Sequence, residues 1–257
     1  MTVTEDFEQP VDDLWYGRQY ALDRFFMEQE VPRLLAQQIT TRGRVEHRPR
    51  GHVISYGQEW VHIVVSGCVL DASPHGAQRI WGKGAIIGDL TPLHSPPDKP
   101  RRTGTGPRIV FLAESFVVSL TVGTLLQVVA EDPHTALFLL KLVNTRAATV
   151  ESVYANAHLR PHARVAKLFD YLGVIARSHR WRYTRAGLRS IQPGALTVEG
   201  PSQVDIAQAL GLGRATVEKA LAYLRSEGVL KSPQQRHNRF FEVEDVDRLR
   251  TIALGGS

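Results

Sequence analysis

The segment from Ser202 to Gly228 constrains the fold of this chain most, because it predicts two short helices joined by a tight turn. Ser202 and Asp205 have the spacing of a capping box, in which each side chain bonds the backbone N–H of the other residue. Gly211 supplies the left-handed conformation that commonly ends a helix. A second helix begins near Gly213 and stops at Gly228. This pattern predicts a helix-turn-helix.

Apolar residues recur at helical spacing in both predicted helices and would pack them together. The inward set is Val204, Ile206, Ala207 and Leu210 in the first helix, and Val217, Ala220, Leu221 and Leu224 in the second. The outward side of the second helix would then face the major groove of DNA. There Arg214 could donate two hydrogen bonds to a guanine, Thr216 could contact a phosphate, and Lys219 could reach a base or a phosphate.

A basic hairpin is expected after the second helix, with strands at Val229–Lys231 and Arg239–Val243. It would form a wing along the sugar–phosphate backbone. The alternative is a helical hairpin beside a solvated loop, but the cap, the turn glycine, the inward residues and the wing coincide, which favours DNA binding. The predicted DNA-binding residues are Ser202, Gln203, Arg214, Ala215, Thr216, Glu218, Lys219, Arg236, His237 and Arg239.

The charge of the chain is uneven along its length. Residues 158–257 carry 16 Lys and Arg against 9 Asp and Glu, a net of +7, whereas residues 1–157 carry 15 against 17, a net of −2. Lys and Arg attract a polyanion such as DNA because neutralised phosphates release their counterions. A solvated basic surface explains the charge equally well, so charge alone does not decide between the two.

Between Arg44 and about Thr121 the chain changes to short β-rich runs separated by glycines, which predicts a β-barrel or sandwich. Helical spacing predicts one or two helices before it, from Asp12 to Gln38, with a break near Pro32. The predicted strands are Val53–Tyr56, Val61–Val65, Cys68–Ala72, Arg79–Trp81, Ile109–Leu112 and Phe116–Leu120.

A long helix is predicted from Pro133 to Arg160, because Pro161 would deny the next backbone hydrogen bond. Its apolar residues alternate at spacings of three and four, as in a seam between two copies of the helix; the alternative is one helix packed on its own domain. After it we expect a helix to about Ser178 and a polar linker over 180–200. The predicted seam is Leu140, Val143, Ala147, Val150, Tyr154 and Ala157.

Several classes of protein are disfavoured by the sequence. Cys68 is the only cysteine, which excludes an intrachain disulfide and a four-cysteine cluster; in a predicted strand it is expected to be a core residue. The histidines show no metal-ligand spacing, so no metal site is expected. No nucleotide-binding or nucleophile motif indicates an enzyme. The chain lacks a secretory signal and a membrane-spanning run, so a cytoplasmic location without membrane contact is expected.

The stretch from Ile206 to Leu230 resembles the helix-turn-helix of the Crp/Fnr family of transcription regulators almost throughout. The resemblance implies an α+β fold with a cyclic-nucleotide-binding-like β-roll, a long dimerisation helix and a C-terminal winged helix-turn-helix. The implied domains are 1–132, 133–160 and 161–257. Arg214 and Lys219 match base-contacting positions of the family. Ala215 stands where many members have a glutamate, so the target sequence does not carry over.

The resemblance is looser in the sensor half, where Gly88-Asp89-Leu90 is similar to the family's phosphate-binding cassette. Asp89 is shorter than the family's glutamate, the following loop is longer and contains prolines, and Val150 replaces a serine. A cyclic nucleotide is therefore considered but not favoured, haem stays open, and the effector is unknown. The implied effector-binding residues are Gly88, Asp89, Leu90, Arg102, Thr103 and Thr149.

These inferences lead to one preferred hypothesis and one alternative. The preferred hypothesis is a homodimer that binds an inverted repeat in double-stranded DNA, with RNA polymerase as a further partner and with control by a small molecule in the roll. The alternative is a cyclic-nucleotide binding module whose winged domain contacts other proteins.

Overall fold

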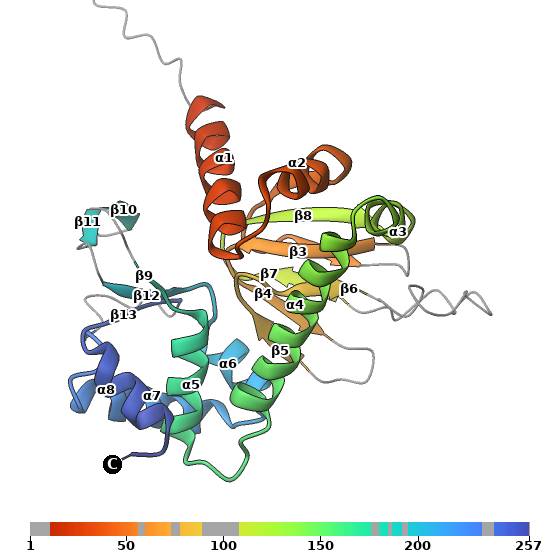
Figure 1. Cartoon of the computed structure of the whole chain (residues 1–257). Helices are drawn as coiled ribbons and strands as arrows, with labels where there is room; N and C mark the ends of the chain where they lie inside the picture. Colours follow the sequence, from red (N-terminus) through yellow and green to blue (C-terminus); the bar gives the residue numbers. More distant parts are fainter. Residues whose placement is uncertain are drawn as a thin grey trace, which may run out of the picture.

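The computed structural model describes residues 11–55, 60–72, 78–88, 108–175, 180–184, 187–191, 195–232 and 239–256 (Figure 1). Two helices come first, α1 (Val11–Glu28) and α2 (Arg33–Arg42). Pro32 is the N-cap of α2, which confirms the predicted break between the helices.

Eight strands of the described residues form two four-stranded antiparallel sheets, with the orders β1-β8-β3-β6 and β2-β7-β4-β5. We call these two sheets the roll. The β-rich prediction is confirmed, although β1 and β6 were not among the predicted strands. The strands are β1 (Arg44–Arg48), β2 (Val53–Ser55), β3 (Trp60–Ser66), β4 (Val69–Ala72), β5 (Gln78–Trp81), β6 (Ile86–Gly88), β7 (Arg108–Phe111) and β8 (Ser115–Thr121).

Strand β3 is buried on both faces because its alternate residues point into two different cores. Val61 and Ile63 belong to a core that also contains residues of α1, α2 and α3 (Val122–Glu131). Val64 points between the two sheets, where it joins Trp81 and Phe111. Helices therefore cover the outer face of one sheet, while the two sheets bury each other's inner faces.

Helix α4 (Pro133–Thr149) has Asp132 as its N-cap and continues into one π-helical turn, η2 (Val150–Tyr154). The side-chain amide of Asn156 donates hydrogen bonds to two carbonyls of that turn, at 2.9 and 2.6 Å. The prediction of one helix reaching Arg160 is therefore wrong, because the chain leaves the helix after η2.

The C-terminal domain contains four helices and a three-stranded sheet of order β13-β12-β9 within the described residues. Its elements are α5 (Pro161–Leu172), β9 (Val174–Ile175), β10 (Arg180–Thr184), β11 (Gly187–Ile191), β12 (Leu196–Glu199), α6 (Gln203–Leu210), α7 (Arg214–Ser226), β13 (Phe240–Val243) and α8 (Val246–Ala253).

Two predictions for the start of this domain are wrong. The helix expected to reach Ser178 ends at Leu172, and after Gly173 the chain pairs as β9 with β12. A Cβ at Gly173 would lie 2.6 Å from Leu196, so this close approach requires glycine. The segment expected to be a linker, 180–200, contains β10, β11 and β12.

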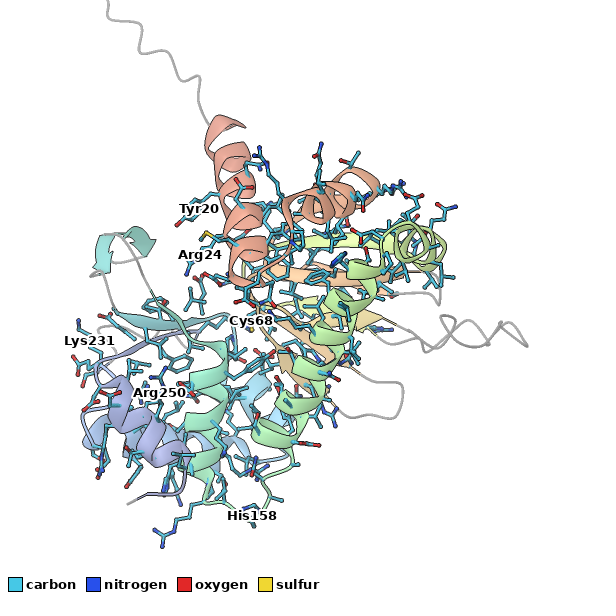
Figure 2. All side chains as sticks on the ribbon, in the orientation of Figure 1. Tyr20, Arg24, Cys68, His158, Lys231 and Arg250 are labelled. Carbon is cyan, nitrogen blue, oxygen red and sulfur yellow. The ribbon has the colours of Figure 1, made fainter. Side chains whose placement is uncertain are left out.

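The roll and the C-terminal domain share one apolar core. It includes Phe169 of α5, Ile206 of α6 and Leu221 of α7, and it continues without a break to Cys68 and Ile80 of the roll. Figure 2 shows Cys68 where the two parts meet. Cys68 is buried, as expected of a core residue, and burial raises the pKa of its thiol. The predicted domain boundaries after residues 132 and 160 stay a prediction.

Candidate nucleic-acid interface

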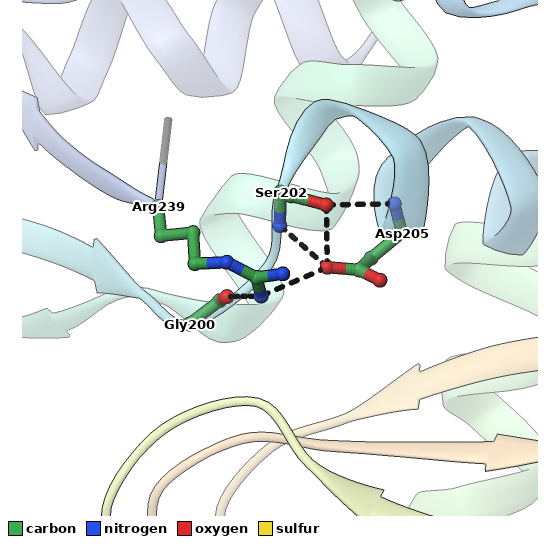
Figure 3. A network of polar contacts seen from close by, with 4 residues as sticks. All are labelled: Gly200, Ser202, Asp205 and Arg239. Atoms are coloured by element: carbon green, nitrogen blue, oxygen red, sulfur yellow. Dashed lines mark hydrogen bonds and ion pairs between the residues drawn. The ribbon is translucent and has the colours of Figure 1, made fainter. Parts of the chain in front are cut away.

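Helix α6 starts with the capping box that the sequence predicts. The Ser202 hydroxyl accepts a hydrogen bond from the Asp205 backbone N–H at 3.2 Å, and the Asp205 carboxylate accepts from the Ser202 backbone N–H at 2.7 Å (Figure 3). These two bonds satisfy donors that a helix N-terminus would otherwise leave without partners. They fix where α6 begins.

Arg239, predicted to contact DNA from the wing, is part of the same network. One guanidinium nitrogen donates to the Gly200 carbonyl at 2.9 Å and to the Asp205 carboxylate at 3.1 Å (Figure 3). The side chain therefore ties the start of β13 to the start of α6. A guanidinium held in this way is less free to reach a phosphate than the sequence suggested.

The turn between the two helices is built from glycines in different conformations. Gly211 has φ 61°, the left-handed conformation predicted for it, and ends α6. Gly213, at φ −71°, is the N-cap of α7. Arg164 of α5 donates to the carbonyl of Leu210, the last residue of α6. No local pattern predicts this contact, because Arg164 and Leu210 are 46 residues apart in the chain.

Helix α7 buries one face and exposes the other, as predicted. Val217, Ala220, Leu221 and Leu224 are buried, and so are the inward residues of α6 apart from Val204, which is exposed. The outward face begins in the first turn and comprises Arg214, Ala215, Glu218 and Lys219, all exposed, with Thr216 half-buried.

The two basic side chains of the outward face, Arg214 and Lys219, make no hydrogen bond or ion pair with any residue that the structure describes. They lie in the first two turns of α7, where the helix dipole and the unpaired backbone N–H groups also favour an anion. This end of α7 therefore offers positive charge and hydrogen-bond donors to a ligand outside the chain.

The wing is formed in part by the predicted strands. Leu230 bridges to Val243, and the Lys231 backbone N–H donates to the Glu242 carbonyl at 3.0 Å. The main partner of β13 is β12 rather than the segment 229–231. Arg236 and His237 lie outside the described residues.

Few of the predicted effector-binding residues lie in the described parts of the chain. Gly88 ends β6 at φ 141°, and a Cβ there would lie 2.5 Å from the Trp60 carbonyl. Thr149 is buried on α4 and donates its hydroxyl to Thr145 at 2.8 Å. Asp89, Leu90, Arg102 and Thr103 lie outside the described residues.

The predicted seam divides between two environments. Leu140, Val143 and Ala147 are exposed on α4, and Leu137 beside them is exposed as well. Val150 packs partly against the core between the two sheets. Tyr154 does not join the exposed stripe, because its hydroxyl bonds the backbone of β5, and Ala157 lies beyond η2. The prediction of one continuous six-residue seam is wrong at its C-terminal end.

A polar chain on the inner face of the roll was not predicted. The Ser119 hydroxyl donates to Glu46 at 2.8 Å, so the Nδ1 of His62, 2.8 Å from the same hydroxyl, must be the donor in that second bond. The Nε2 of His62 is buried without a hydrogen-bond partner in the structure. Burial lowers the pKa of His62 to about 4, although Glu46 acts in the opposite direction.

The described residues offer neither a cluster of metal ligands nor a membrane-spanning helix. They contain no group of three His, Cys, Asp or Glu side chains that could hold a metal ion, and none of their helices is long and apolar enough to cross a membrane.

Comparisons with known proteins give one matching domain model and several similar folds. Residues 163–252 match the model of the Crp-like helix-turn-helix domain. The chain is similar to a protein of Ruegeria pomeroyi provisionally described as a cyclic nucleotide binding protein, at 16% identity and a TM-score of 0.56, over 93% of this chain and 98% of that one.

Two further structures are similar at a TM-score of 0.51. FixK2 of Bradyrhizobium japonicum is 16% identical over 82% of this chain and 96% of its own. A CRP-family transcriptional regulator of Thermus thermophilus is 20% identical over 82% of this chain and 97% of its own. No curated protein sequence matches the chain.

Proposed function

Because this chain has the fold of the Crp/Fnr transcription regulators and carries a Crp-like helix-turn-helix domain, we propose that it binds a specific inverted repeat in DNA as a homodimer. The observation that carries the proposal is the outward face of α7. Arg214 and Lys219 are exposed there on a helix whose opposite face is fully packed. A helix so placed can enter the major groove with its N-terminal turns foremost.

The homodimer is supported by the exposed apolar stripe on α4. Leu137 is 64% exposed, Leu140 54% and Val143 37%, and Ala147 continues the stripe one turn later. Apolar residues repeated along one face of a helix are stabilised when a second copy covers them. Two copies joined there would present two α7 helices to half-sites about one DNA turn apart.

Selection from random duplex DNA tests the proposal directly. The expected result is an inverted repeat whose half-sites lie about one helical turn apart. Arg214→Ala should weaken binding to that site by about 1–3 kcal/mol, because a bidentate contact with a base is lost, and should change binding to random DNA far less. Arg33→Ala removes the same charge from the exposed part of α2 and serves as the control.

Two outcomes would count against this function. One is a selection that recovers no inverted repeat at modest salt. The other is an equal loss on specific and random DNA for Arg214→Ala, because Arg214 would then read only the phosphate backbone.

Control by a small molecule in the roll is a further part of the proposal. Gly88 marks where the predicted cassette begins, and Thr149 lies on the helix beside the roll. We expect calorimetric titration with cyclic AMP to show no micromolar binding, since Asp89 and Val150 both depart from the cyclic-AMP pattern. Tight cyclic-AMP binding without DNA affinity would instead favour a nucleotide-binding module whose winged domain contacts proteins.

A further inference from the structure

The short segment from Ile80 to Ile86, which joins β5 to β6, is bonded by side chains from three helical elements. These side chains are Arg146 of α4, Tyr154 of η2 and Tyr171 of α5. The segment leads directly into Gly88, where the predicted effector cassette begins. It therefore connects the roll to α4, to η2 and to α5, and we call this set of contacts the junction.

Tyr154 bonds both polar groups of one residue on an edge strand. Its hydroxyl donates to the Ile80 carbonyl at 2.5 Å and accepts from the Ile80 backbone N–H at 2.9 Å. Strand β5 is the last of its sheet among the described strands, so within that part of the chain these backbone groups have no neighbouring strand to pair with. The Tyr154 hydroxyl takes the place of that strand.

Tyr171 of α5 bonds the backbone of the same segment two residues further along the chain. The Gly82 backbone N–H donates to the Tyr171 hydroxyl at 3.0 Å, and a side-chain hydrogen bond joins Tyr171 to Thr149 of α4. A Cβ at Gly82 would lie 3.2 Å from Leu172, so α5 packs closely on this segment. Tyr171 thus links the C-terminal domain to the roll and to α4 at one point.

Arg146 completes the set from α4. Its guanidinium donates to the Ile86 carbonyl at 2.7 Å and to the Asp71 carboxylate at 3.3 Å, and it lies 4.9 Å above the ring of Trp81. Trp81 is fully buried, so the partly exposed guanidinium of Arg146 covers the face of a core aromatic ring. Helix α4 is thereby held to both sheets.

We propose that Arg146, Tyr154 and Tyr171 are positioning residues for DNA recognition, which set the orientation of the C-terminal domain by fixing α4, η2 and α5 to the segment Ile80–Ile86. This inference rests on the proposed function for its DNA readout only. A dimer binds two half-sites together only when both α7 helices are already spaced and aligned, and rigid attachment reduces the entropy lost on binding.

Both hydroxyls keep their protons at physiological pH. Burial raises the pKa of Tyr171 to about 12, and burial also raises the pKa of Tyr154. Because neither hydroxyl loses its proton near neutral pH, the hydrogen bonds of Tyr154 and Tyr171 do not change over that pH range.

The buried thiol of Cys68 reports whether this attachment has opened. Cys68 is the only cysteine, is 3% exposed, and lies in the shared core with the charge of Asp205 nearby. A thiol reagent can reach it only when the C-terminal domain moves off the roll or the protein unfolds. Labelling with Ellman's reagent therefore measures opening without any DNA.

The variant Tyr154→Phe/Tyr171→Phe removes the two hydroxyls and keeps both rings. Each lost hydrogen bond should raise the opening equilibrium, and with it the labelling rate, roughly 2- to 12-fold. The rate should depend less steeply on denaturant than global unfolding does, because opening the junction exposes only part of the buried surface. Tyr223→Phe, whose ring stacks on His162 inside the C-terminal domain, should leave the rate unchanged.

Labelling at the wild-type rate in the double variant would overturn the proposal. So would labelling whose denaturant dependence equals that of global unfolding, since the tyrosines would then contribute only to overall stability. Arg146→Lys keeps the charge but loses the paired donors of the guanidinium, so it should also make the labelling of Cys68 faster.

The DNA-binding measurement compares two duplexes, the selected inverted repeat and a duplex that carries one half-site. The double variant should bind the inverted repeat at least about threefold more weakly and the half-site as tightly as wild type does. Equal losses on both duplexes would contradict the positioning role. If the wild-type protein selects no DNA, the proposed function fails while the labelling result still decides whether these residues hold the junction closed.

Discussion

At the scale of single residues, the buried side chain of His62 predicts how the stability of the protein depends on pH. The unfolded chain takes up a proton on this side chain near pH 6.5, whereas the folded protein takes it up only near pH 4. Stability is therefore complete above pH 6.5 and is lost as the pH falls toward 4, by up to about 3 kcal/mol. His62→Gln should flatten this part of the pH profile of the free energy of unfolding. His158→Gln, at an exposed position beyond η2, should leave it unchanged.

Gly211 and Gly213 provide a matched pair at the turn before α7. An alanine at 211 must keep φ near 61°, and no atom lies within 4 Å of its Cβ, so the cost is backbone strain alone. Gly211→Ala should lower the free energy of unfolding by about 1–2 kcal/mol. Gly213→Ala, at φ −71°, loses only the preference of an N-cap for glycine over alanine and should cost less than Gly211→Ala does. Similar losses for both, measured by urea denaturation, would show that the positive φ of Gly211 does not decide the cost.

At the scale of elements, the sequence predicts the end of a helix when the contacts that fix that end are local in the chain. The ends of α6 were predictable because the Ser202–Asp205 box and Gly211 are local signals. The end of α4 was not, because Tyr154 turns toward β5 through a contact 74 residues away in sequence. The strands β10 to β12 were mistaken for a linker because each is only four or five residues long and the segment is polar and Arg-rich. That composition outweighed the short alternation that β10 and β12 do show.

Arg239 ties the wing to α6, and we call this contact the brace. It leads to a prediction at this scale. Arg239→Ala removes the hydrogen bonds to Gly200 and Asp205 and should destabilise the C-terminal domain by about 1 kcal/mol, a modest value because the Arg239 side chain is 40% exposed. Arg250→Ala breaks a more exposed pair with Asp170 and should cost less than about 0.5 kcal/mol. Chemical denaturation of the two variants measures the difference, and equal values would mean that Arg239 is not a brace.

At the scale of the whole molecule, the sequence predicted the order of roll, long helix and winged domain, because each has its own periodicity. It did not predict that roll and C-terminal domain share a core, since Cys68 and Ile80 look like ordinary strand residues until α6 is seen beside them. Of the candidate site, the outward residues of α7 followed from helical geometry, whereas the role of Arg239 required the fold.

The proposed homodimer gives a prediction at the scale of the assembly. Leu140→Glu places a charge in the middle of the exposed apolar stripe of α4 and should weaken dimerisation at least about tenfold, because the carboxylate would be buried between two copies. Leu126→Glu changes a leucine of similar exposure on α3 and should leave the dimer intact. Sedimentation equilibrium distinguishes the two variants. A dimer that survives Leu140→Glu must use another surface.

The core that runs from Cys68 and Ile80 into α5, α6 and α7 also determines how the protein can be taken apart. Two domains that share no core melt separately and can be expressed as fragments, but here one core joins the C-terminal domain to part of the roll. Heating should therefore produce a single cooperative endotherm. A fragment beginning at Pro161 would carry an uncovered apolar surface into water, and self-association is the expected fate of such a surface.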